Sequence, residues 1–294
     1  MPFAIGGGFV AFVLLRLDMD AFLAALERTN FLGFIAFTFA FAVSLLLTDS
    51  MATAHVYRKL VGPVSFRDYV TIRGASYLPS LINHHVGQAW ITYYASKVYK
   101  APLWRVAGAT LVVYATILGT VVAFSTIGLI LAPGRFSWLP YVIGGLLVAA
   151  MLYLLVLHSF PALLRKRQVT EALADLGVSG HLTAFLWRIP HVCVLFVGSW
   201  IPFSFFGVSI PLVDAFTVVP PLMIIVALPL TPQGVGTRDA FAAAVFTVYV
   251  SGAAGDAGAV VAAATLSWAV LLSLVQIPIS MLLLRPAQRL LDKA

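Results

Sequence analysis

The residues of this chain that could do chemistry gather in two short polar stretches, each set within a long apolar region. The first stretch holds an amide, two adjacent histidines, a glycine and a glutamine: Asn83, His84, His85, Gly87 and Gln88. The second is a glycine-rich step that leads into an ion pair: Gln233, Gly234, Gly236, Thr237, Arg238 and Asp239. Glycine next to polar side chains can leave backbone N–H groups open to a ligand. We predict that these two stretches form a binding site.

Arg238 and Asp239 are the strongest candidates, because ionisable side chains within apolar sequence are costly to bury and are usually functional. A guanidinium group can bind a phosphate through two parallel hydrogen bonds, and Asp239 could hold that phosphate in place or carry a proton. The alternative is structural: Arg238 extends to the surface, or it pairs with Asp239 or Asp214.

The two adjacent histidines, His84 and His85, favour contact with a phosphate. An imidazole ring could then titrate near neutral pH. The alternative is a polar tip that only satisfies broken backbone. We expect no metal site, because adjacent histidines on a helix point in different directions and no nearby Cys, Asp or Glu completes a ligand set. His158, His181 and His191 are expected to make contacts between helices.

Known catalytic motifs are absent from the sequence. It contains no HExxH motif of a metalloprotease, no GxSxG motif of a serine hydrolase and no Walker loop for a nucleotide. We therefore expect no enzymatic activity and no cofactor. The single cysteine, Cys193, lies in an apolar run and is interpreted as a small buried hydrophobic residue.

The composition indicates that the elements around these stretches lie in a bilayer. Of the 294 residues 61% are hydrophobic. Only 10% are charged, against about 25% in an ordinary soluble protein. A bilayer-spanning helix needs about 20 mostly apolar residues. Six runs are predicted to span the bilayer: Met1–Leu15, Thr29–Thr48, Val106–Gly134, Phe136–Leu164, Ile189–Val213 and Ala257–Leu284. The first is interpreted as a short N-terminal membrane helix rather than a cleaved signal peptide.

Two further apolar regions, at about 69–97 and 215–252, are interrupted by proline and glycine and contain the two polar stretches. Proline removes a backbone donor and glycine weakens a helix, so each region should break into two half-helices. Inside a bilayer, broken backbone is tolerated only where protein or trapped water satisfies it. We therefore predict two re-entrant hairpins in a single membrane domain that covers residues 1–294.

The positions of the basic residues predict the orientation. With the C-terminus in the cytoplasm, most of the 18 Lys and Arg residues fall on the cytoplasmic side. They form four clusters: Arg58, Lys59, Arg67 and Arg73; Lys97, Lys100 and Arg105; Arg165, Lys166 and Arg167; and Arg285, Arg289 and Lys293. Arg188 is expected near the same face. The first hairpin then enters from the cytoplasm and the second from outside, and both termini are cytoplasmic.

Opposite entry of two hairpins suggests an inverted repeat, an architecture common among secondary transporters. The sequences 85–89 (HVGQA) and 234–238 (GVGTR) share a Val-Gly step that leads into an apolar helical run. Two helix N-termini that face each other near the midplane would attract an anion. The basic clusters are short and lie between apolar runs, so we expect no nucleic-acid binding.

Several segments resemble the transmembrane region of lysylphosphatidylglycerol synthases, a flippase-like domain family. The segment 231–240 (TPQGVGTRDA) is similar to that family's Pro-x-Gly-x-Gly-x-Arg-Glu signature, with Asp239 in place of Glu. The segments 76–94 (SYLPSLINHHVGQAWITYY), 101–114 (APLWRVAGATLVVY) and 16–26 (RLDMDAFLAAL) are similar to its first hairpin, next span and first external segment. The acidic residue usual at the first tip is missing here, and so is the family's aminoacyl-transferase domain.

The resemblance implies a membrane module that moves lipid, not a synthase. Our leading hypothesis is a transporter in a bacterial inner membrane that carries an anionic phospholipid or a polyprenyl-phosphate lipid between leaflets. One alternative is a scaffold that docks a partner enzyme. Another is an intramembrane enzyme that acts on lipid phosphates with His84 or His85 as acid or base. Membrane lipids are the expected partners, and a homo-oligomer or an enzyme partner stays open.

Overall fold

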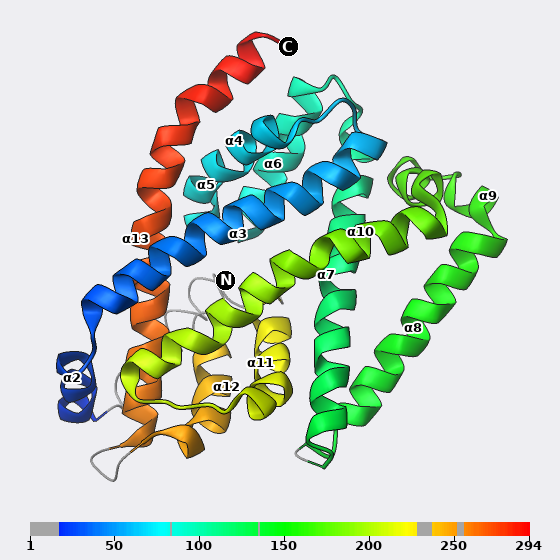
Figure 1. Ribbon diagram of the computed structural model, residues 1–294. Coiled ribbons are helices and arrows are strands. Elements are labelled where there is room, and N and C mark those ends of the chain that lie inside the picture. The colour runs from blue at the N-terminus through cyan, green and yellow to red at the C-terminus, as the bar shows by residue number, and fades with distance from the viewer. Residues whose placement is uncertain (1–17, 83, 135, 228–236, 252–255) are drawn as a thin grey trace.

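The computed structural model of the chain describes residues 18–82, 84–134, 136–227, 237–251 and 256–294 (Figure 1). These residues form helices, turns and one isolated β-bridge. In chain order the helices are α2 (Met19–Glu27), α3 (Phe31–Leu60), α4 (Phe66–Ala75), α5 (Tyr77–Ile82), α6 (His84–Val98), α7 (Leu103–Leu131), α8 (Leu139–Ser159), α9 (Pro161–Leu164), α10 (Gln168–Trp200), η1 (Ile201–Phe206), α11 (Leu212–Ala227), α12 (Thr237–Phe246), η3 (Thr247–Tyr249) and α13 (Ala257–Asp292).

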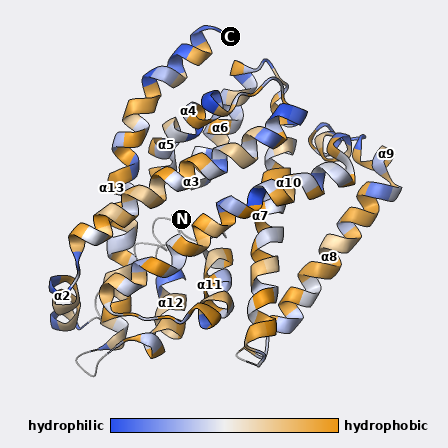
Figure 2. Ribbon diagram, viewed as in Figure 1, coloured by the Kyte–Doolittle hydropathy of each residue, from blue (hydrophilic) through white to orange (hydrophobic). Residues whose placement is uncertain are grey.

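Five helical segments in this part of the chain are long and apolar enough to cross a membrane: α3, α7, α8, α10 continued by η1, and α13. Each overlaps one of the predicted spans, so the all-helical prediction is confirmed. The sixth predicted span, Met1–Leu15, lies outside the described residues. Hydrophobic residues dominate these long helices, and hydrophilic residues gather near α4 and the C-terminus (Figure 2).

α3 starts within the predicted span Thr29–Thr48 but continues to Leu60, past the predicted end. The Asn30 side chain accepts a hydrogen bond from the Gly33 amide at 3.0 Å and starts the helix. Arg58 and Lys59 lie in the last turn, where cations favour the negative end of the helix dipole. The helix therefore continues past Thr48 and carries Asp49 inside the molecule.

The first interrupted region forms α4, α5 and α6 instead of one long helix. The backbone breaks between α4 and α5, and α13 satisfies the break through Ser280. The Ser280 hydroxyl accepts a hydrogen bond from the Leu78 amide at 3.2 Å and donates one to the Ala75 carbonyl at 2.8 Å. Both backbone groups therefore have partners despite the interruption, as low-dielectric surroundings require.

Both interrupted regions return to the end of the molecule from which they start. At one end, Leu60 precedes the first region and Arg105 follows it. Arg105 Nε donates a hydrogen bond to the Leu60 carbonyl at 2.6 Å. At the other end Val208 and Val250, on either side of α11 and α12, form the antiparallel bridge. Figure 1 shows α4, α5 and α6 near the C-terminus, and α11 and α12 at the opposite end.

Each group of short helices has its own hydrophobic core. One buried cluster includes Tyr69 of α4 and Ile91 of α6, packed with α3, α7 and α10. The other includes Val218 of α11 and Phe246 of α12, packed with α10, η1 and α13. The long helices α10 and α13 contribute to both clusters, so they connect the two ends of the molecule.

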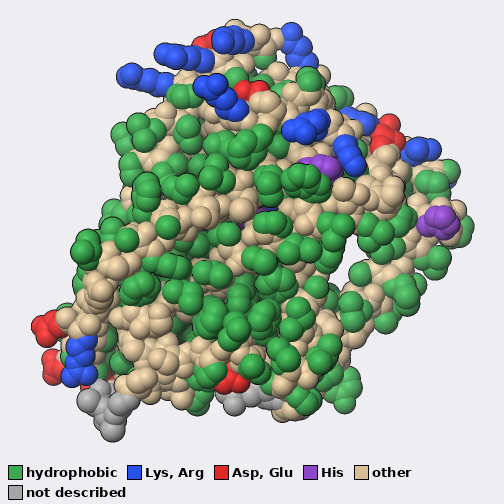
Figure 3. Space-filling view, in the orientation of Figure 1, with side chains coloured by type: hydrophobic (Ala, Val, Ile, Leu, Met, Phe, Trp, Pro, Cys, Tyr) green, Lys and Arg blue, Asp and Glu red, His purple; other side chains and the backbone are tan. Residues whose placement is uncertain are grey.

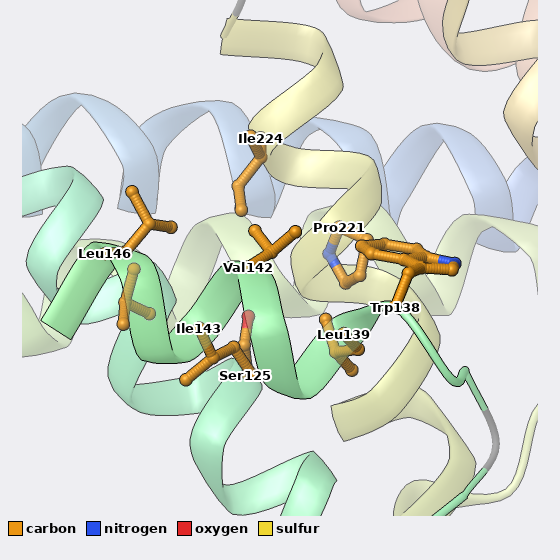
Figure 4. Close-up of a pocket in the computed structure, with 9 residues that line it drawn as sticks. Ser125, Trp138, Leu139, Val142, Ile143, Leu146, Pro221 and Ile224 are labelled. Carbon is orange, nitrogen blue, oxygen red and sulfur yellow. The ribbon is translucent and has the colours of Figure 1, made fainter.

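α8 packs less closely than the other long helices and leaves an apolar groove beside α7 and α11 (Figure 4). The groove encloses about 150 Å³ and is lined by Val122, Ser125, Trp138, Leu139, Val142, Ile143, Leu146, Pro221 and Ile224. The Ser125 hydroxyl donates to the Val121 carbonyl at 3.0 Å, so this hydroxyl is already satisfied. Most of the lining is aliphatic, so the groove suits apolar material.

Lys and Arg side chains gather on the face near α4 and the C-terminus in Figure 3. Arg73 departs from the prediction for its cluster, because the residue is 9% exposed and its side chain lies in the protein core. Cys193 also departs from prediction, since it is exposed on α10 rather than buried.

Candidate functional site

The predicted pair Arg238 and Asp239 lies buried in the first turn of α12, where α12 packs against α13. The two side chains belong to residues that are 9% and 7% exposed. Arg238 Nε and one terminal nitrogen, Nη2, donate to Asp239 Oδ1 at 3.2 and 3.0 Å. Nη2 also donates to the Thr265 carbonyl of α13 at 3.1 Å. Arg238 therefore does not extend to the surface, and its cation is held at an interface between helices.

The position of this pair at the start of α12 also suits its charges. Asp239 lies in the first turn, where a carboxylate favours the positive end of the helix dipole. Thr237 is the first residue of α12, and the helix begins directly after the glycine-rich step. The predicted site residues Gln233, Gly234 and Gly236 lie outside the described residues.

The first polar stretch forms the start of α6. His84 is its first residue, His85 is exposed and Gln88 is half-buried, and Asn83 lies outside the described residues. The Gln88 carbonyl accepts a hydrogen bond from the Thr92 hydroxyl at 2.9 Å, within the helix. The structure thus places these residues at a helix start, as expected for the second half of a hairpin.

Gly87 has a packing role that the sequence did not reveal. A Cβ atom at this position would overlap the Ser80 side chain of α5. Glycine therefore lets α5 and α6 approach closely at the point where the chain turns. α5, α6 and α12 all pack against α13. The prediction that the two tips face each other falls on residues outside the described ones.

A third polar site, which we did not predict, lies buried between α3, α4 and α10. Asp49 of α3 accepts hydrogen bonds from Arg73 Nε at 2.6 Å through Oδ2 and from Arg188 Nη1 at 2.7 Å through Oδ1. Arg188 Nη2 donates to Thr53 at 2.9 Å. His191 Nε2 lies 3.9 Å from Asp49 Oδ1. Three charged or titratable side chains, one from α4 and two from α10, thus surround the Asp49 carboxylate of α3.

Burying the charged side chains of this cluster costs free energy, so their retention calls for an explanation. Arg188 is completely buried, and Asp49 is 7% exposed. Charges in such surroundings are retained only when they are paired and hydrogen-bonded. The predicted contact role of His191 is confirmed in that it is buried on α10 and its ring lies beside Asp49 of α3.

The sequence contained a signal for this cluster that we interpreted differently. Asp49 directly follows the apolar run that ends at Thr48, and Arg188 directly precedes the run that starts at Ile189. Charges at the ends of apolar runs are typical of membrane boundaries, so Arg188 was expected near the cytoplasmic face, and no role was predicted for Asp49. The helices in fact continue through these residues, and their crossing brings Asp49 and Arg188 together.

Comparison with protein families gives a match over nearly all of the chain. The model of the lysylphosphatidylglycerol synthase TM region covers residues 1–274. Comparison with curated proteins and with solved structures gives no match. The match agrees with the resemblance carried by the segment 231–240 and with the apolar helices described above. The chain is therefore a multi-pass membrane protein that belongs to the lysylphosphatidylglycerol synthase TM region family.

Proposed function

We propose that this protein moves an anionic phospholipid or a polyprenyl-phosphate lipid between the leaflets of a bacterial inner membrane. The observation that carries the proposal is the paired arrangement of the short helices. One group lies at each end of the molecule, each leaves and returns at its own end, and both pack against α13. Family membership supports a role that involves membrane lipid.

In this proposal the two groups are re-entrant hairpins that enter the bilayer from opposite faces as an inverted repeat. Their contacts with α13 are widely separated. Arg238 donates a hydrogen bond to the Thr265 carbonyl, and the Ser280 hydroxyl donates one to the Ala75 carbonyl. Fifteen residues of helix correspond to roughly 22 Å along the axis, most of the hydrocarbon thickness. The contacts thus suit two half-sites near opposite leaflets, and rocking of one repeat against the other would alternate access.

The lipid headgroup would bind at the half-site formed by Arg238 and the start of α12. Arg238 is a buried cation with a short link to one carboxylate oxygen, and a lipid phosphate can exchange with that carboxylate. The start of α12 adds backbone donors and the positive end of a helix dipole. The apolar groove between α7, α8 and α11 adds a surface on which an acyl chain could rest while the headgroup crosses.

The orientation follows from the basic face. We propose that the end with α4 and the C-terminus (Figure 3) faces the cytoplasm, because Lys and Arg concentrate in cytoplasmic loops. The same face is the observation that favours the second candidate function, a scaffold whose basic loops dock a soluble enzyme. A partner that co-purifies in a fixed ratio, with no lipid movement by the protein, would favour the scaffold.

The experiment is a lipid-translocation assay in proteoliposomes that contain fluorescent phosphatidylglycerol, with a membrane-impermeant quencher added outside. We expect the wild type to move the probe and Arg238→Ala to reduce the rate to that of empty liposomes. Arg28→Ala is the matched control, because it removes an exposed arginine close to the same end of the molecule. Normal transport by Arg238→Ala, with the protein still folded, would remove Arg238 from the mechanism.

A further inference from the structure

The cluster around Asp49 holds more positive than negative charge. Arginine stays protonated in proteins, so Arg73 and Arg188 are both cations. Within the part of the chain that the structure describes, Asp49 is the carboxylate in ion-pair contact with each of them. Two buried cations therefore share one buried anion. A net charge in low-dielectric surroundings is costly, and it calls for a further anion.

The excess charge falls on Arg188 rather than on Arg73. Arg73 lies in the last turn of α4, where the helix dipole favours a cation, and its Nη1 donates to the Ser76 hydroxyl at 3.2 Å. Arg188 lies in the interior of α10, far from either helix end, and its side chain is completely buried. It therefore has no dipole to offset its charge.

Unpaired buried polar atoms belong to the same cluster. Arg188 Nε and His191 Nδ1 are buried and have no hydrogen-bond partner among the described residues. The two residues lie one turn apart on the same face of α10. The buried hydroxyls of Tyr77 and Tyr114 also lack partners within the described structure, and both interact electrostatically with Arg73 and Asp49. Buried polar atoms of this kind need an explanation, and a bound ligand is one.

We propose that this cluster binds one phosphate group, either on a lipid headgroup or as free phosphate. Its several oxygens would accept hydrogen bonds from Arg188 Nε, and from His191 Nδ1 once the imidazole takes up a second proton beside the anion, and would share the two guanidinium groups with Asp49. Because Arg188 is completely buried, the ligand enters only when the helices around the cluster separate. The site is separate from Arg238, and the proposal does not require that the protein moves lipid.

The test measures thermal unfolding of the full-length protein in a sugar-based detergent free of phosphate. One arm adds phosphatidylglycerol and the other adds inorganic phosphate, at constant ionic strength. We expect at least one probe to raise the unfolding temperature of the wild type. A response to the lipid alone identifies a headgroup site, and a response to both identifies a site for the phosphate group itself.

Arg188→Gln is the decisive variant, because it leaves one arginine and one aspartate and so balances the charge. We expect it to fold, and to bind the effective probe at least about tenfold more weakly, since it removes a charged hydrogen-bond donor. Arg105→Gln is the matched control. It removes an arginine from the partly exposed pair with Asp175, and we expect its response to equal that of the wild type.

Two further variants keep the proposal testable if Arg188→Gln does not fold. Asp49→Asn removes the shared carboxylate, and we expect tighter phosphate binding together with lower stability in the absence of phosphate. His191→Ala removes one unpaired nitrogen, and we expect weaker binding. A wild type that responds to neither probe, or an Arg188→Gln variant that keeps the full response, would overturn the proposal.

Discussion

At the scale of single residues, the buried carboxylate of Asp49 is the group on which most of the polar structure between α3, α4 and α10 depends. It accepts hydrogen bonds from two arginines that come from different helices. Asp175 provides a natural comparison, because it also contacts two arginines, Arg105 and Arg165, but is partly exposed. The two aspartates differ mainly in burial, so they separate the effect of burial from that of charge.

We expect Asp49→Asn to lower the free energy of unfolding by about 3–5 kcal/mol, because it leaves buried arginines without their partner. Asp175→Asn should change it by less than about 1 kcal/mol, because solvent screens an exposed pair. Chemical denaturation in phosphate-free detergent followed by tryptophan fluorescence measures both. Equal effects of the two substitutions would show that the buried cluster contributes no more than a surface pair.

The residues that the sequence could and could not predict differ in a physical way. Arg238 and Asp239 were predictable, because a buried ion pair next to a glycine-rich step stands out within apolar sequence. Asp49 and Arg188 were not, because each lies beside an apolar run, where a charge is the ordinary boundary signal. Only the crossing of α3 and α10 shows that they share one site.

At the scale of the elements, close helix packing depends on glycines that the sequence does not distinguish from one another. A Cβ atom at Gly128 of α7 would overlap the backbone carbonyl of Phe216 in α11. A Cβ atom at Gly145 of α8 would meet nothing within 4 Å. The same residue type is thus required at one position and dispensable at the other.

We expect Gly145→Ala to stabilise the protein by up to about 1 kcal/mol, because alanine loses less backbone entropy in a helix. Gly128→Ala should destabilise it by about 1–3 kcal/mol, because α7 and α11 must move apart. Thermal unfolding of the two variants under identical detergent conditions gives the comparison. A loss of stability in both variants would mean that α8 packs against something beyond this chain at Gly145.

The element boundaries show what sequence periodicity can provide. Each of the five predicted spans after the first overlaps a long apolar helix, because about 20 consecutive apolar residues have few alternatives to a membrane helix. Their ends were less accurate, since α3 and α13 continue past the predicted ends at Thr48 and Leu284, and α10 begins at Gln168, well before the predicted start at Ile189. The break in the first region was expected from Pro and Gly, but α11 continues through Pro220 and Pro221. Ser280 as the partner of the first break could not be inferred from local sequence.

At the scale of the whole molecule, the two short-helix groups at opposite ends predict a definite membrane topology. Arg67 and Lys100 are exposed near the end that carries α4, and Ser209 is exposed near the end that carries α11 and α12. Replacement of Cys193 by Ser provides a background free of cysteine, because the sequence contains only that one.

In this background, we expect Arg67→Cys and Lys100→Cys to react with a membrane-impermeant maleimide from the cytoplasmic side. Ser209→Cys should react only from the outer side. Labelling in right-side-out and inverted vesicles measures the difference. Reaction of Arg67→Cys and Lys100→Cys from opposite sides would contradict the first hairpin, because α4, α5 and α6 would then form a full crossing.

The contacts of α13 have a mechanical consequence. Thr265 is bonded to Arg238 in one group of short helices, Ser280 is bonded to Ala75 in the other, and Pro278 lies between the two attachment points. Proline removes one backbone hydrogen bond inside the helix and makes that turn easier to bend. α13 can therefore bend at Pro278, and a bend there would change the angle between the two groups of short helices.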